Sequence, residues 1–209
     1  MFKANKYRLV ITFDVEDWFT NGQSIKVDSW GNYELRVEKN IDRILKLLDE
    51  TKTSATFFIL GWMAEKLPGM VKKIHKLGHE ISSHGYAHEL VYLQSKNEFR
   101  NDVRKSKLIL EDIIGERIYG YRAPCFSITD WALPILAEED YLYDSSYAAN
   151  VFKKSHLSHF NSSKLSICNK IYNNFYEVSL PYMKINNLSI PWEVVDTLDY
   201  IHTLFMSGE

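Results

Sequence analysis

The sequence predicts an α/β fold in which parallel strands alternate with helices. Short apolar runs rich in β-branched and aromatic residues recur along the first two thirds of the chain, separated by segments with the apolar spacing of helices. Residues able to do chemistry come at the carboxyl ends of these runs. Because β/α barrels place their active sites at the carboxyl ends of their strands, the pattern predicts one site at one mouth of a barrel-like sheet.

The expected elements follow from local spacing. Strand-like runs cover residues 8–13, 55–60, 79–83, 118–121, 141–146 and 176–180. Helical spacing is found over residues 37–49, from Pro68 to Gly78, from about Phe99 to Gly115, and after Thr129. Pro134 lies inside the last of these segments and should limit its length. After Asn150 the alternation weakens.

The composition is that of one globular domain. Of the 209 residues, 45% are hydrophobic and 25% are charged. The net charge of −2 provides no basic field, which argues against nucleic acid as a partner. The N-terminus reaches acidic residues before any apolar core of the signal-peptide kind, and no apolar run is long enough to span a bilayer. We therefore expect a cytoplasmic protein without a transmembrane segment. Its two cysteines suggest no disulfide framework.

Two short motifs predict a divalent-metal site. His84 and His88 are four residues apart in SHGYAH and can give two nitrogen ligands to one ion. In TFDVED, the carboxylates of Asp14, Glu16 and Asp17 fall within four residues after an apolar run, and their mutual repulsion is costly without a compensating cation. Together the motifs supply nitrogen ligands, an oxygen ligand and a spare base. Three protein ligands with an open position are typical of a catalytic rather than a structural metal site.

A third motif, GYRAP, contributes Arg122. An arginine at a strand end can clamp a carboxylate and hold it ionised. The order TFDVEDW, SHGYAH, GYRAP resembles the polysaccharide deacetylases of the NodB-homology group, carbohydrate esterase family 4, in particular the branch with a DVED first motif found in exopolysaccharide gene clusters. The likeness covers roughly residues 9–147. It implies a deformed (β/α) barrel and a hydrolase that removes N-acetyl groups from a polysaccharide or a lipid-linked amino sugar.

The resemblance gives roles to individual residues of this chain. It makes Asp14 the general base, and it makes His84 and His88 metal ligands. Arg122 would position the base. Asp144, in YDSS, would help to tune that arginine. The resemblance therefore implies a divided site, in which the histidines bind the metal and Asp14, positioned by Arg122, accepts the proton of the attacking water.

The acidic metal ligand stays open between Glu16 and Asp17. The commonest family motif has two adjacent aspartates, whereas Val15 intervenes here. Glu16 lies on the same side as Asp14 if the strand stays extended, and Asp17 would need a turn. Zinc suits a ligand set of two histidines and a carboxylate, and cobalt, nickel or iron would also fit.

Aromatic and turn residues near these motifs are the candidates for substrate binding. Trp18, Tyr86 and Pro124 are the three that we assign to this role. The expected partner is an N-acetylated glycan or a lipid-linked sugar.

The late part of the chain departs from the family. There the general acid is a histidine, which in this branch lies in a segment reading like His-Pro-Trp-Glu, whereas residues 190–193 here read IPWE. His156, His159 and His202 are weaker alternatives. We therefore expect a NodB-homology domain over residues 1–192, a divergent tail over residues 193–209, and a barrel that is incomplete at its C-terminal strands. A partner or a second copy of the chain would cover the resulting open edge.

Two other functions fit the same residues. One is hydrolysis of a different C–N bond, in a ureide or a formamido sugar. The other is a truncated metal-binding or sugar-binding fragment with little turnover, because the missing late histidine would remove protonation of the leaving amine.

Overall fold

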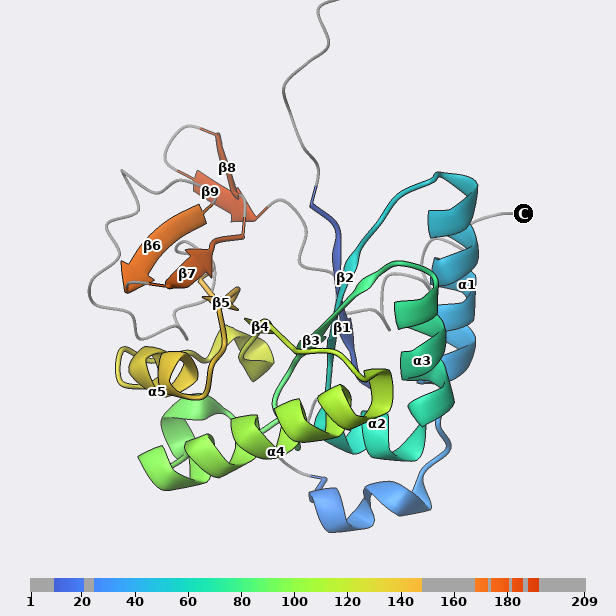
Figure 1. Ribbon diagram of the computed structural model, residues 1–209, viewed down its shortest axis with the longest axis horizontal. Coiled ribbons are helices and arrows are strands. Elements are labelled where there is room, and N and C mark those ends of the chain that lie inside the picture. Colours follow the sequence, from blue (N-terminus) through green and yellow to red (C-terminus); the bar gives the residue numbers. More distant parts are fainter. Residues whose placement is uncertain are drawn as a thin grey trace, which may run out of the picture.

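Parallel strands form most of one seven-stranded sheet. The computed structural model describes residues 10–20, 25–147, 168–172 and 174–180, and the backbone of residues 182–185 and 188–191. The strands are β1 (Thr12–Val15), β2 (Thr56–Ile59), β3 (Glu80–Ser83), β4 (Gly120–Tyr121), β5 (Tyr143–Asp144), β6 (Cys168–Tyr172), β7 (Phe175–Val178), β8 (Tyr182–Ile185) and β9 (Leu188–Pro191). The sheet order is β1-β2-β3-β4-β5-β7-β6, with only β6 antiparallel to its neighbour, and β8 and β9 form a separate antiparallel pair (Figure 1).

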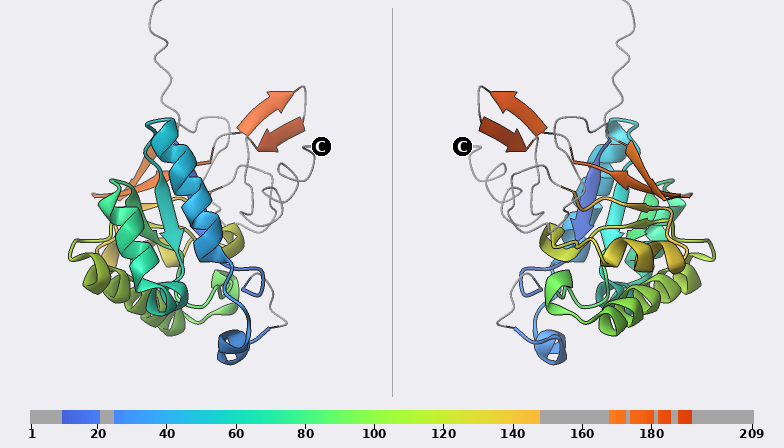
Figure 2. Two further views of the ribbon diagram at one scale, coloured as in Figure 1. Left: turned by 90° about the vertical axis from the view of Figure 1, so that its right-hand side faces the viewer. Right: turned by 90° about the vertical axis from the view of Figure 1, so that its left-hand side faces the viewer.

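The helices form one continuous layer against this sheet. They are α1 (Val37–Glu50), α2 (Gly61–Lys66), α3 (Pro68–Lys76), α4 (Lys96–Ile114) and α5 (Ala132–Glu138), with 3-10 turns η1 (Val27–Asn32), η2 (Val91–Leu93) and η3 (Pro124–Phe126). Helix α1 contacts α3, α3 contacts α4, and α4 contacts α5 (Figures 1 and 2). No helix among the described residues is both long enough and apolar enough to cross a membrane.

Local sequence explains where the helices begin and end. In α1 the apolar residues with the predicted helical spacing are all buried, so this face packs toward the core. Helix α4 begins with a capping box in which Ser95 and Glu98 each bond the other's backbone N–H. It ends at Gly115, whose φ of +74° suits glycine. Pro134 lies in the first turn of α5, where its missing N–H removes no helical bond, so it starts this short helix rather than breaking it.

Some expectations for the elements were wrong in extent. Strand β1 continues through Asp14 to Val15, so Asp14 lies within the strand and not after it. Strands β4 and β5 have two residues each, fewer than the apolar runs suggested. Helix α2 and strands β6, β8 and β9 were not predicted, because each is too short for its periodicity to stand out from its neighbours.

The sheet curls around a common interior. Arg122, directly after β4, donates from Nη1 to Thr12 Oγ1 on β1 at 3.0 Å. In a flat sheet, three strand spacings would separate these strands by about 14 Å, so the contact requires a barrel-like bend. Among the described strands, β1 and β6 are each paired on one side only, which leaves the barrel open. The predicted α/β class is confirmed, and the strands that the structure describes do not close a barrel.

Candidate metal centre

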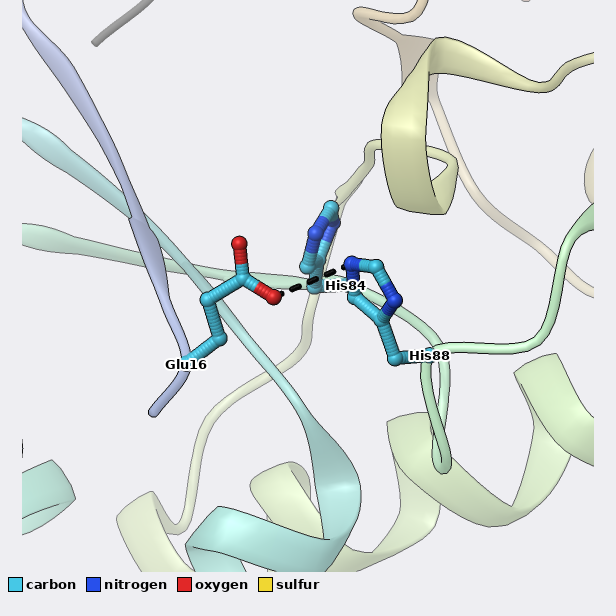
Figure 3. Close-up of side chains that lie close together, drawn as sticks. All are labelled: Glu16, His84 and His88. Atoms are coloured by element: carbon cyan, nitrogen blue, oxygen red, sulfur yellow. Dashed lines mark ion pairs between the residues drawn. The ribbon is translucent and has the colours of Figure 1, made fainter. Parts of the chain in front are cut away.

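Three side chains converge at the carboxyl end of the parallel strands. Glu16 follows β1, His84 follows β3, and His88 lies in the loop after His84; one ligand atom from each lies within 4.8 Å of the others. Glu16 Oε2 is 3.0 Å from His88 Nε2, and the three side chains are at most 5% exposed (Figure 3). Two imidazole nitrogens and one carboxylate oxygen in this arrangement fit the ligand set of a catalytic zinc ion.

A tight loop turns the two histidines toward the same point. Gly85 and His88 have φ values of +74° and +54°. Behind the loop, both carboxylate oxygens of Asp102 on α4 accept the Tyr86 N–H, at 3.1 and 3.0 Å. A Cβ atom on Gly85 would lie 2.8 Å from Asp102 Oδ2, so this close approach requires glycine. Helix α4 therefore fixes the loop that carries both histidines.

His84 is oriented by the backbone of the arginine motif. Its Nδ1 lies 2.9 Å from the carbonyl oxygen of Arg122, so Nδ1 carries the proton and Nε2 is left to act as a ligand. Burial lowers the pKa of His84 and outweighs the opposing charges of Asp14 and Glu16. The neutral imidazole that results is the form that binds metal.

Asp14 lies beside this cluster and is paired with Arg122. Its Oδ1 accepts from Arg122 Nη1 at 2.7 Å, and its Oδ2 is 4.0 Å from His84 Nε2. Burial acts to raise the pKa of Asp14, but the positive charge of Arg122 and its hydrogen bond to Asp14 bring the pKa below its ordinary value. Asp14 is therefore held as a carboxylate next to the candidate ligands.

Arg122 is fixed mainly by Ser145, the residue after β5. Its Nε donates to Ser145 O at 3.0 Å and its Nη2 donates to Ser145 Oγ at 3.1 Å. Asp144, which was predicted to tune this arginine, is fully buried and accepts from Ser146 Oγ at 2.6 Å. The positive charge of Arg122 acts to lower the pKa of Asp144. That Asp144 tunes Arg122 stays a prediction.

Sequence reasoning missed Glu177. This residue lies on β7 directly opposite Asp144 on β5, and its side chain is fully buried. Burial raises the pKa of Asp144 to about 6. Burial and the charge of Asp144 together raise the pKa of Glu177 well above its ordinary value. The available signal was an acidic residue within a strand-like run, since glutamate is almost never fully buried without a partner.

Asp17 points away from the histidines and caps the start of α1. Its carboxylate accepts the backbone N–H groups of Trp18 at 2.9 Å, Arg36 at 2.6 Å and Val37 at 2.9 Å. The Arg36 and Val37 N–H groups lie at the start of α1, so Asp17 caps this helix, and the Trp18 N–H adds a third donor. Of the two carboxylates that the sequence left open, Glu16 is the one that reaches the histidines.

The predicted substrate-binding residues lie in different surroundings. Trp18 is 43% exposed, and its ring packs edge-on against Phe19 and Tyr33. The Tyr86 hydroxyl donates to Glu65 on α2 at 2.9 Å, so the ring of Tyr86 is engaged by the helical layer. Pro124 is buried at the start of η3. Their roles toward a substrate stay predictions, and Trp18 is the one whose ring is open to solvent.

Comparisons with known proteins agree with these motifs. Residues 3–143 match the family described as polysaccharide deacetylase. The chain belongs to the polysaccharide deacetylase family. A peptidoglycan-N-acetylglucosamine deacetylase of Bacillus cereus is 34% identical over 100 residues, covering 48% of this chain and 36% of that protein. A peptidoglycan deacetylase of Helicobacter pylori is 30% identical over 115 residues, covering 55% of this chain and 39% of that protein.

A solved structure of a polysaccharide deacetylase is also similar to this chain. A peptidoglycan N-acetylglucosamine deacetylase, in complex with an N-hydroxybenzamide compound, is 28% identical with a TM-score of 0.53. The match covers 67% of this chain and 56% of that one. The chain spans less than half the length of the two curated relatives that it matches.

The candidates for the family's late histidine, the general acid, fall outside the part of the chain that the structure describes. His156, His159 and His202 lie outside this part, as do Trp192, Glu193 and the predicted tail over residues 193–209. The source of the leaving-group proton and the boundary of the domain therefore stay predictions.

Proposed function

We propose that this member of the polysaccharide deacetylase family is a metal-dependent hydrolase that removes acetyl groups from N-acetylated sugar units of a glycan. The observation that carries the proposal is Asp14, held by Arg122, beside the cluster of Glu16, His84 and His88. A fixed base next to three metal ligands is the arrangement that hydrolysis by an activated water requires. The two curated relatives, both named as peptidoglycan deacetylases, support the same reaction class.

We infer that Glu16, His84 and His88 hold a divalent cation. When bound, such an ion polarises a carbonyl oxygen and lowers the pKa of the water that it holds. Zinc is our first choice because two imidazoles and one carboxylate suit it, and cobalt, nickel and iron are alternatives that availability would decide.

Asp14 would take the proton of the attacking water. Its side chain is 16% exposed, whereas that of Arg122 is 3% exposed, so the carboxylate borders the mouth and the guanidinium lies behind it. The hydrogen bond from Arg122 fixes the carboxylate in direction and keeps it ionised between turnovers. Ser145 fixes the guanidinium in turn, which leaves Asp14 little freedom to rotate away from the water.

Trp18 would supply a surface for a sugar ring. Its ring is exposed, lies two residues after Glu16 and is held from the side by Phe19 and Tyr33. A polysaccharide or a lipid-linked amino sugar would both present such a ring. We favour a cytoplasmic location, which suits a lipid-linked precursor, and cell fractionation would test it.

The test is acetate release from N-acetylglucosamine oligomers by the zinc-loaded chain. Asp14→Asn should lower kcat by roughly 10²- to 10⁴-fold, because it removes the base. Asp49→Asn is the matched control, since it makes the same change in an exposed carboxylate paired with Lys52. No acetate from any N-acetyl sugar, or full activity in Asp14→Asn, would overturn the proposal. Release of product from allantoin or a formamido sugar instead would favour hydrolysis of another C–N bond.

A further inference from the structure

The two carboxyl groups of Asp144 and Glu177 meet inside the sheet. Both residues are fully buried, and they face each other in the register of β5 and β7. One oxygen of each group, Asp144 Oδ2 and Glu177 Oε2, is buried and has no hydrogen-bond partner among the described residues, and each carboxyl group acts on the pKa of the other. A carboxylate can only accept hydrogen bonds, so a bond between two carboxyl groups requires that one of them carry a proton. With both groups ionised, Asp144 Oδ2 and Glu177 Oε2 would be buried acceptors without a donor.

This carboxyl pair holds the two residues that follow Ser145. Asp144 Oδ1 accepts from Ser146 Oγ at 2.6 Å, and Glu177 Oε1 accepts from the Tyr147 N–H at 3.0 Å. Ser145 Oγ donates to Val178 O, next to Glu177, at 2.9 Å. The segment that carries both Ser145 acceptors for Arg122 is therefore attached to β7 through these contacts.

We propose that Asp144 and Glu177 hold one proton between them and act as a positioning pair, which fixes Ser145 and, through it, the Arg122 guanidinium that holds Asp14. Glu177 is a positioning residue in this proposal, because it accepts from Tyr147 and faces Asp144 rather than the candidate metal ligands or Asp14. The effect of the pair on catalysis rests on the proposed function. The shared proton and the fixed Arg122 guanidinium are structural and do not rest on the proposed function.

The charge balance around the pair favours a single proton. Arg122 is the cation that acts on both carboxyls, and its positive charge favours one negative charge nearby. Tyr121, which the charge of Asp144 also affects, is neutral because burial raises its pKa well above the ordinary value. Among the described residues, a second negative charge would have no cation of its own, since Arg122 is already paired with Asp14.

The first test does not depend on enzyme activity. The infrared spectrum at neutral pH should contain the band of one protonated carboxyl group that is lost in both Glu177→Gln and Asp144→Asn. Nuclear magnetic resonance should show a slowly exchanging Arg122 Nε–H, bonded to Ser145 O, in the wild type and in Glu177→Gln. Glu177→Gln should keep this slow exchange, because the glutamine amide can donate to Asp144 without a titrating proton. Glu177→Leu cannot donate and should lose the slow exchange. Absence of the carboxyl band in the wild type would overturn the shared proton.

The pH dependence of unfolding gives a second readout with a definite sign. Because folding raises the carboxyl pKa values, the pair stabilises the fold fully below the ordinary carboxyl pKa, and this contribution is lost as pH rises through the native values. For one proton, the unfolding equilibrium constant rises about tenfold per pH unit in that window. Glu177→Gln should remove this rise.

Glu139→Gln is the control with the opposite sign. Burial acts to raise the pKa of Glu139, but Arg104 and Arg100 together lower it below its ordinary value. Its stabilisation is therefore present above the ordinary pKa and is lost as pH falls. Relative to the wild type, Glu177→Gln should therefore gain stability as pH rises, whereas Glu139→Gln should lose it. A wild-type pH dependence in Glu177→Gln would contradict the proposal.

Kinetics test the link to the reaction. Glu177→Leu should lower kcat by about 10- to 100-fold without changing zinc affinity, and Glu177→Gln should restore kcat close to the wild-type value. An equal loss of kcat in Glu177→Leu and Glu177→Gln would overturn the positioning role. It would show that the ability of residue 177 to hydrogen-bond to Asp144 does not matter to the reaction. If the wild type releases no acetate while the infrared, resonance and pH results hold, the proposed function fails and the positioning pair stands.

Discussion

Replacing Asp17 by alanine should weaken the fold and leave metal binding intact. The Asp17 carboxylate is fully buried and accepts three backbone N–H groups, from Trp18, Arg36 and Val37, at 2.6–2.9 Å. A hydrogen bond to a charged acceptor contributes about 1.5–3 kcal/mol net, but the bonds from Trp18 and Arg36 are only partly buried, so water can replace part of what they contribute. The free energy of unfolding should therefore fall by roughly 3–5 kcal/mol, a large part of the stability of an ordinary domain.

Glu16→Gln should show the reverse behaviour. It removes the charged oxygen that lies 3.0 Å from His88 Nε2, but it disturbs no helix cap. Zinc affinity should fall by at least about 100-fold, since losing a direct ligand costs more than losing a residue that supports one. The stability of the metal-free chain should change far less than in Asp17→Ala.

The assays are urea unfolding of the metal-free chain and calorimetric titration with zinc. Both variants are measured beside Asp49→Asn, which alters a surface ion pair with Lys52. The reasoning is refuted if Asp17→Ala unfolds at the wild-type urea concentration, or if it loses zinc as fully as Glu16→Gln does. In that case Asp17 would be the acidic ligand that the adjacent-aspartate motif suggests.

Three further changes test the geometry around the site. Arg122→Lys keeps the charge but cannot reproduce the fork to Ser145 and Asp14, so kcat should fall about 10- to 100-fold while zinc affinity stays unchanged in titration. Gly120→Ala would place a Cβ atom 2.2 Å from the Tyr143 ring. It should lower the free energy of unfolding, measured in urea, by about 1–3 kcal/mol. Gly31→Ala is the control, because its Cβ atom would meet nothing within 4 Å. Ser95→Ala removes half of the capping box of α4 and should cost about 1 kcal/mol without changing kcat; a loss of activity greater than the loss of folded protein would show that α4 matters to the site in another way.

Much of the fold could be predicted from local pattern. The amphipathic spacing in α1, the glycine that ends α4 and the apolar runs of β2 and β3 are each visible in consecutive residues. Strands of two residues could not be predicted in extent, because their ends depend on pairing with neighbours rather than on their own sequence. The shortest helix, α2, is set partly by the histidine loop, since its Gly61 and Trp62 N–H groups donate to the carbonyls of Gly85 and Tyr86.

The sequence by itself determined which chemical groups are present and which of them come near the carboxyl ends of successive strands. Residue type and spacing alone show two histidines four residues apart, a cluster of carboxylates and an arginine before a proline turn. These features predicted a metal site with a general base and an arginine that holds that base. Only the tertiary structure separated Glu16 from Asp17, because the direction of each carboxylate depends on where β1 ends and α1 begins. It also brought in Glu177, whose position opposite Asp144 comes from strand pairing across a long separation in sequence, which no local pattern encodes.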